Sequence, residues 1–121
     1  MPTALIIEDT PDNAVLISFI LQKNGYETSW AKNGHQGINM ALTERPDFII
    51  LDIQLPDIDG TEVLKKLLSA EINFSIPIIA MTSYAMSGDR EKLLAAGCSG
   101  YIEKPINPMT VMTQICEIIA G

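Results

Sequence analysis

The sequence predicts one α/β domain, built on a doubly wound, five-stranded parallel sheet with strand order 2-1-3-4-5 and helices on both faces. Short apolar runs alternate with segments of helical periodicity five times along the chain, which is the pattern of a parallel sheet covered on both faces. Right-handed crossovers between such strands favour the doubly wound topology, and its five-stranded version has this order. The length of 121 residues suits a single domain.

The first strand and helix carry clear boundary signals. Ala4–Ile7 is an apolar run that ends on two acidic residues. Thr10 and Pro11 then indicate a helix start, with the Thr10 hydroxyl as the capping group and the proline in the first turn. Apolar residues at i, i+4 spacing continue as far as Asn24-Gly25, which indicates the end of the helix.

The next two strands differ in polarity. Tyr26–Ala31 is the more polar of the two, so we expect it at an edge of the sheet, followed by a helix over Gln36–Thr43. Phe48–Leu51 is wholly apolar and rich in β-branched residues, which predicts a strand buried on both faces. A loop with Pro56 follows, and then a helix over Thr61–Leu68.

The remaining elements repeat the alternation. Ile76–Met81 is a second buried strand, and the helix after it covers Ser87–Ala96. Gly100–Glu103 is a short last strand, which Lys104-Pro105 ends. A final helix is predicted to open at Asn107 or Pro108.

Composition excludes several classes of function. The formal net charge of −7 disfavours nucleic acid and anionic membrane as direct partners. The two cysteines have no zinc-binding spacing, so we expect reduced, mostly buried thiols. No signal peptide or membrane-length apolar run is apparent, and we therefore expect a cytoplasmic protein.

Polar residues follow the central strands, at the points where those strands end. In a sheet of this type, ligands bind beyond the carboxyl ends of the strands, between strands one and three. The first strand ends on Glu8-Asp9, the third on Asp52, the fourth on Thr82 and the fifth on Lys104. The predicted topology therefore brings three acids and a lysine to one place.

Three carboxylates this close together repel one another. One pair at about 4 Å costs on the order of 4 kcal/mol at an effective dielectric near 20, so either a pKa rises or a cation lies among them. Oxygen ligands without histidine or cysteine suit Mg²⁺, or Mn²⁺. Asp9 and Asp52 are the expected direct ligands, and Glu8 would act through water. Taken alone, the acid pair is also explained as an ordinary acidic helix N-terminus.

Four segments together resemble the receiver domain of two-component response regulators, which has the CheY-like fold. They are LIIEDTPDN, IILDIQLPDIDG, IIAMTSYA and AGCSGYIEKPI, and the resemblance covers essentially the whole chain. The segment DIQLPDIDG is also similar to that of single-domain, DivK-type regulators. Residues 1–121 are therefore expected to form one receiver domain with no output domain, either as a complete single-domain regulator or as a fragment of a larger chain.

The resemblance implies specific roles at the strand ends. Asp52 would accept a phosphoryl group from a phosphohistidine on a sensor histidine kinase or a histidine phosphotransfer protein. Glu8 and Asp9 would hold Mg²⁺, with the backbone carbonyl of Gln54 as a further ligand. Lys104 would bind a phosphoryl oxygen. Any catalysis would be of its own phosphorylation and dephosphorylation, within a signalling switch.

Further implied roles concern switching. Thr82 would bind a phosphoryl oxygen and move inward, so that Tyr101 fills the space that it leaves, and Pro105 would make a cis peptide bond with the lysine before it. The readout surface for a downstream protein would comprise the fourth helix, last strand and fifth helix, namely Met86–Ala95, Gly100–Lys104 and Asn107–Ile118.

Three alternative functions fit the sequence less well. A haloacid-dehalogenase-like phosphatase needs an acid where Gln54 stands. A flavodoxin-like electron carrier would have a phosphate-binding loop where the chain has Glu8-Asp9. A receiver-like module that is not phosphorylated remains open, although the Asp52, Thr82 and Lys104 set disfavours it.

Four residues outside this set have simpler interpretations. Asp57 is explained by turn chemistry, and His35 by a position on the surface. Trp30 is expected to cover the sheet edge. Met86, after the fourth strand, is the methionine most expected at an interface.

Overall fold

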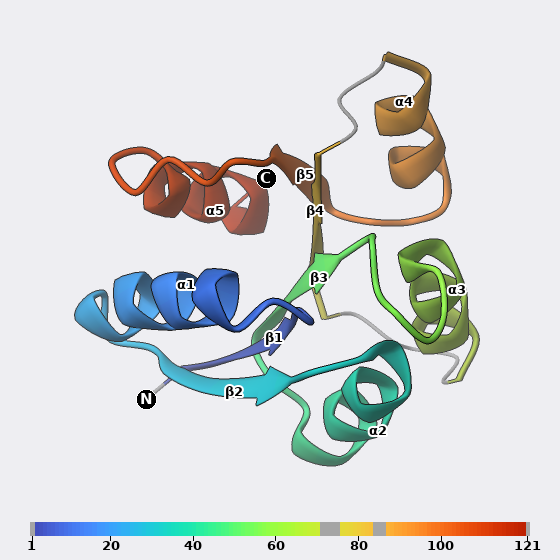
Figure 1. Cartoon of the computed structure of the whole chain (residues 1–121), viewed down its shortest axis with the longest axis horizontal. Coiled ribbons are helices and arrows are strands. Elements are labelled where there is room, and N and C mark those ends of the chain that lie inside the picture. Colours follow the sequence, from blue (N-terminus) through green and yellow to red (C-terminus); the bar gives the residue numbers. More distant parts are fainter. Residues whose placement is uncertain (1, 71–75, 84–86, 121) are drawn as a thin grey trace.

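The computed structural model describes residues 2–70, 76–83 and 87–120. Ten elements alternate along the chain (Figure 1). The strands are β1 (Thr3–Ile7), β2 (Glu27–Ala31), β3 (Phe48–Asp52), β4 (Ile78–Thr82) and β5 (Gly100–Glu103). The helices are α1 (Pro11–Lys23), α2 (Gly34–Glu44), α3 (Gly60–Ala70), α4 (Ser87–Ala95) and α5 (Val111–Ala120).

All neighbouring strands are parallel, and their order is β2-β1-β3-β4-β5, which confirms the predicted topology. Figure 1 shows α1 and α5 on one face of the sheet and α2, α3 and α4 on the other. The polar strand β2 lies at an edge, as predicted, while β3 and β4 are buried along their whole length. This arrangement places the carboxyl ends of all five strands at one edge of the sheet.

Two hydrophobic clusters sandwich the sheet. Successive residues of a strand point to opposite faces, so Phe48 and Ile50 join one cluster while Ile49 and Leu51 join the other. The first cluster packs beneath α1 and α5, where the rings of Tyr26 and Phe48 meet edge to face with centroids 5.2 Å apart. The second packs beneath α2, α3 and α4. Apolar burial on both faces therefore holds the sheet independently of its polar edge.

One predicted cap and several predicted boundaries differ from the structure; for example, β4 begins at Ile78 rather than Ile76, and α2 begins at Gly34 rather than Gln36. Thr10 precedes α1, but its side chain makes no capping hydrogen bond; its N–H instead donates to Glu8 Oε1 at 3.2 Å. β2 begins one residue later than predicted because the Tyr26 N–H donates to the Leu21 carbonyl at the end of α1. α5 begins at Val111, since the Asn107 carbonyl and side chain first close a separate turn.

The amino edge of the sheet is held by a different contact. Asp47 accepts the Thr3 N–H at 2.6 Å and thereby fastens the start of β1 to the start of β3.

Both cysteines are free, as expected, but only Cys98 is buried and Cys116 is exposed. Among the described residues, no helix is both long and apolar enough to cross a membrane.

Candidate functional site

The buried polar side chains lie at the carboxyl edge of the sheet, which is the edge where the parallel strands end. Within the described part of the chain, the buried polar side chains are Glu8, Asp52 and Thr82, with exposed fractions of 1%, 2% and 3%. Each stands at or just beyond the end of a central strand. Asp9 is exposed beside them. Carboxylates are rarely this buried without partners, so the edge needs a source of positive charge.

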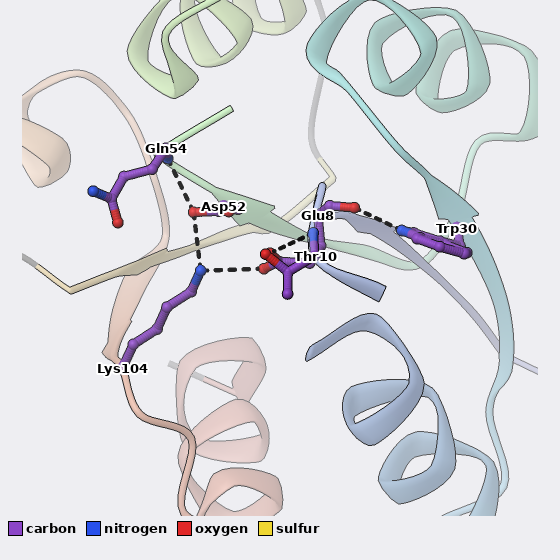
Figure 2. Close-up of polar contacts among 6 residues, drawn as sticks. All are labelled: Glu8, Thr10, Trp30, Asp52, Gln54 and Lys104. Carbon is purple, nitrogen blue, oxygen red and sulfur yellow. Dashed lines mark hydrogen bonds and ion pairs between the residues drawn. The ribbon is translucent and has the colours of Figure 1, made fainter. Parts of the chain in front are cut away.

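Lys104 supplies part of that charge. Its Nζ lies 3.2 Å from Asp52 Oδ1 and 3.3 Å from Glu8 Oε2, so one ammonium group contacts two buried carboxylates (Figure 2). The lysine is positioned by the sheet, because its N–H donates to the Thr82 carbonyl at 2.8 Å and continues the pairing of β4 with β5. The Lys104–Pro105 peptide bond is cis, as the resemblance implied.

The charge on Asp52 remains costly. Burial raises its pKa above the ordinary value of 3.8, and the nearby Glu8 carboxylate acts in the same direction. The Gln54 N–H, which donates to Asp52 Oδ1 at 2.9 Å, and the Lys104 ammonium oppose the rise without cancelling it. Two donors on one oxygen also fix the orientation of the carboxylate.

The acid cluster fits a hard divalent cation. Glu8, Asp9 and Asp52 each offer a carboxylate oxygen, and these atoms all lie within 4.8 Å of one another. An all-oxygen donor set with one exposed member suits Mg²⁺, which keeps several waters and uses few protein carboxylates. A cation there would also offset the burial that raises the Asp52 pKa. The exposed Gln54 lies in the loop that follows β3, two residues after Asp52.

Trp30 makes a contact with this edge that sequence reasoning missed. Its indole Nε1 donates to the backbone carbonyl of Glu8 at 2.7 Å, from the side opposite Lys104 (Figure 2). The ring does lie at the edge strand and is half-buried against the cluster beneath α1 and α5. No local pattern signals this bond, because donor and acceptor are 22 residues apart.

Comparison with known proteins decides the family. The family model of the response regulator receiver domain matches residues 4–116. This chain belongs to the response regulator receiver family. It is therefore a receiver domain of two-component signalling.

Relatives and solved structures agree with this assignment. The receiver domain is 41% identical to the polar-differentiation response regulator DivK of Brucella anthropi, over 87% of this chain and 85% of the relative. It superposes on the chemotaxis protein CheY4 of Vibrio cholerae with a TM-score of 0.90 and 27% identity, over 98% of both chains. The receiver domain of a sensor histidine kinase from Pseudomonas aeruginosa matches with a TM-score of 0.86 and 32% identity, over 99% and 98% of the two chains; that structure has a magnesium ion coordinated in its active-site cleft.

The residues expected to switch lie on the two strands farthest from β1. Thr82 ends β4 and pairs with Glu103, whereas Tyr101 pairs with Ala80, nearer the middle of β5. Tyr101 is half-buried and packs against the cluster beneath α2, α3 and α4. Of the expected readout surface, Met86 lies outside the described residues. Leu94 is an exposed large apolar residue within the expected segment of α4, and Ile119 is another on α5, one residue beyond the expected segment.

Asp57 has a role in this receiver domain beyond its own turn. Its two carboxylate oxygens accept the N–H groups of Gly34 and His35, at 2.8 and 3.0 Å, and so cap the first turn of α2 from the loop after β3. Desolvation opposes the charge, but hydrogen bonds from these backbone groups outweigh it and lower the pKa of Asp57 to about 2. His35 lies on the surface, with Nε2 3.8 Å from the same carboxylate.

Replacing Asp57 with alanine is expected to lower the free energy of unfolding by about 1 kcal/mol at neutral pH, because α2 loses a cap. The folded-state pKa lies below the ordinary 3.8, so this contribution is complete above that value and is lost as the pH falls through about 2. Urea unfolding of both proteins between neutral pH and about pH 2.5 should show their stabilities converging. A difference that stayed constant over this range would contradict the assignment.

Proposed function

We propose that this receiver domain is a phosphorylation-controlled interaction switch in which Asp52 accepts a phosphoryl group. The donor would be a phosphohistidine on a histidine kinase or a histidine phosphotransfer protein. The observation that carries the proposal is the meeting of the Asp52 carboxylate with Lys104 and with the Glu8–Asp9 acid pair at the carboxyl edge. We further propose that residues 1–121 form a single domain and that it acts in the cytoplasm. Nucleic acid and membrane are not its proposed direct partners.

The proposed chemistry is an in-line displacement at phosphorus. A carboxylate oxygen of Asp52 forms the new P–O bond, the P–N bond to the donor imidazole breaks, and the imidazole leaves with that electron pair. Asp52 must be ionised to attack, and the Gln54 N–H and the Lys104 ammonium both favour its charged form. Lys104 can then turn to an oxygen of the phosphoryl group as a mobile point charge.

Glu8, Asp9, Asp52 and the backbone carbonyl of Gln54 are the proposed ligands of Mg²⁺, with Mn²⁺ as a substitute. The ion would supply neutralising charge for the transferred phosphoryl group. Glu8 is the more buried acid of the pair and already contacts Lys104, whereas Asp9 is exposed. The pair therefore offers one acid held in place and one that water can reach.

The proposed output follows from the added charge. A phosphoryl group on Asp52 brings acceptor oxygens that attract the Thr82 hydroxyl and Lys104, and Tyr101 would then repack toward the space left by Thr82. The affected surface comprises α4, β5 and α5, within the predicted segments Met86–Ala95, Gly100–Lys104 and Asn107–Ile118. A downstream protein would bind there preferentially in one of the two states.

Incubation with Mg²⁺ and acetyl phosphate tests the proposal directly. Intact-mass analysis is expected to show one added phosphoryl group, which a chelator prevents and which Asp52→Asn does not acquire. Asp57→Asn is the matched control, since it changes an aspartate in the following loop that we place outside the acceptor site, and it is expected to be modified. Modification that persists in Asp52→Asn would overturn the assignment of the acceptor.

A further inference from the structure

We infer that Trp30 is a positioning residue for the magnesium site, because its indole N–H fixes the peptide that joins Glu8 to Asp9. The inference rests on the proposed function, in which these two acids hold the ion. The decisive contact is the 2.7 Å hydrogen bond from Nε1 to the Glu8 carbonyl. That carbonyl and the Asp9 N–H belong to one planar peptide unit. Its orientation therefore sets the directions from which both acidic side chains leave the backbone.

The pairing of β1 with β2 shows why an extra donor is needed. The Glu8 N–H donates to the Ala31 carbonyl at 3.0 Å and extends the parallel ladder beyond the last paired residues. In such a ladder, the carbonyl of the same residue faces the same neighbouring strand, and here its next donor would be the Asn33 N–H. By then the chain has turned into α2, where the Asn33 side chain accepts the Gln36 N–H as a helix cap. The indole N–H of Trp30 takes the place of the missing ladder donor.

The indole is itself held in place. One side of it packs against the cluster beneath α1 and α5. The Lys32 ammonium lies over the ring, 5.3 Å from its centroid, in a cation–π contact. A ring restrained in this way acts as a fixed donor, whereas a water molecule at the same carbonyl would itself have to be immobilised.

The geometry favours a role at the site over a purely structural one. The acceptor belongs to the peptide between the two proposed ligands, so this bond acts on the backbone unit from which both acidic side chains leave. Glu8 is also held at its side chain, by the Thr10 N–H at Oε1 and by Lys104 at Oε2. With backbone and side chain both fixed, the Glu8 carboxylate is prepared for an ion before one binds.

Replacing only the indole N–H group of Trp30 gives the sharpest test. Trp30 is the only tryptophan of the chain. Expression in a tryptophan auxotroph can therefore replace it with an analogue without altering any other residue. An analogue with sulfur in place of the indole N–H removes the donor and keeps the shape, whereas 5-fluorotryptophan keeps the donor. Isothermal titration with Mg²⁺ is expected to give a dissociation constant about fivefold weaker for the sulfur analogue, as for the loss of one ordinary hydrogen bond. The fluorotryptophan protein should match the parent.

Two further variants separate positioning from stability. Trp30→Phe should weaken Mg²⁺ binding as the sulfur analogue does. Asp47→Ala removes the carboxylate contact to the Thr3 N–H at the opposite edge; it should lower the unfolding midpoint in urea and leave Mg²⁺ affinity unchanged. A sulfur-analogue protein that is folded and binds Mg²⁺ as tightly as the parent would overturn the role of Trp30 alone. A parent protein that does not bind Mg²⁺ would overturn both this inference and the proposed metal site.

Discussion

Replacing Lys104 with methionine is expected to destabilise the fold by about 3 kcal/mol at neutral pH, because the change leaves buried charge without its partner. The ammonium group is the cation that contacts both Glu8 and Asp52, whose side chains are almost fully buried. Methionine keeps most of the length of the side chain but cannot offset either carboxylate. Urea unfolding at neutral pH without a divalent ion would measure the loss, and adding Mg²⁺ should restore much of it.

An exposed lysine provides the matched control. Lys65 Nζ lies 3.7 Å from Glu62 on the surface of α3, with both side chains more than half exposed. Lys65→Met should change the free energy of unfolding by less than about 0.5 kcal/mol, because exposed ion pairs contribute little. Adding Asp52→Asn to Lys104→Met should recover part of the lost stability by removing one of the unpartnered charges. If Lys104→Met is as stable as the parent, the lysine does not neutralise the site.

Replacing Asp52 with asparagine is expected to raise stability at neutral pH and to abolish most of the stabilisation by Mg²⁺. Burial raises the folded-state pKa of Asp52 above its ordinary value of 3.8. The stabilising contribution of its protonated form is therefore present below about pH 3.8 and is lost as the pH rises through the folded-state pKa. Asparagine carries no such charge at any pH, so the variant should be more stable than the parent at neutral pH and lose the advantage toward pH 4.

The response to the ion completes that test. Mg²⁺ at roughly a hundred times its dissociation constant should stabilise the parent by about 2.7 kcal/mol, as for any ligand that binds only the folded state. Asp52→Asn should gain far less, because the variant lacks one of three carboxylate oxygens that lie within 4.8 Å of one another. Thermal unfolding with and without Mg²⁺ at neutral pH would measure both effects. Equal stabilisation of the two proteins would place the ion elsewhere.

The fold was predictable because its signals are local and repeated. Phe48–Leu51 is apolar at every position, and the structure buries each of these residues, with alternate side chains on the two faces of the sheet. Right-handed crossovers favour the doubly wound topology, and its five-stranded version has the strand order that the structure shows. The convergence of Glu8, Asp9, Asp52 and Lys104 followed from the topology, since these residues end or follow strands that terminate at one edge.

Contacts between segments that are distant in sequence were not predictable in the same way. Asp57 fits a turn so well that nothing in its neighbours points to Gly34, 23 residues earlier. Trp30 looked like a cover for the edge of the sheet, since its bond to Glu8 depends on where the chain leaves the ladder. The predicted start of α5 is too early for a related reason. An asparagine before a helical pattern indicates a cap, but Asn107 closes a turn of its own before Val111.

The separation between the apolar body and the polar edge of the sheet has a consequence for evolution. Within the described residues, Glu8, Asp52 and Thr82 are the buried polar side chains, and all three lie at the strand termini. Most of the favourable burial comes from the aliphatic interior, so substitutions at these strand ends change the chemistry and the local charge balance while that interior keeps the architecture. One fold can therefore acquire new reactivities at the ends of its strands without changes to its hydrophobic core.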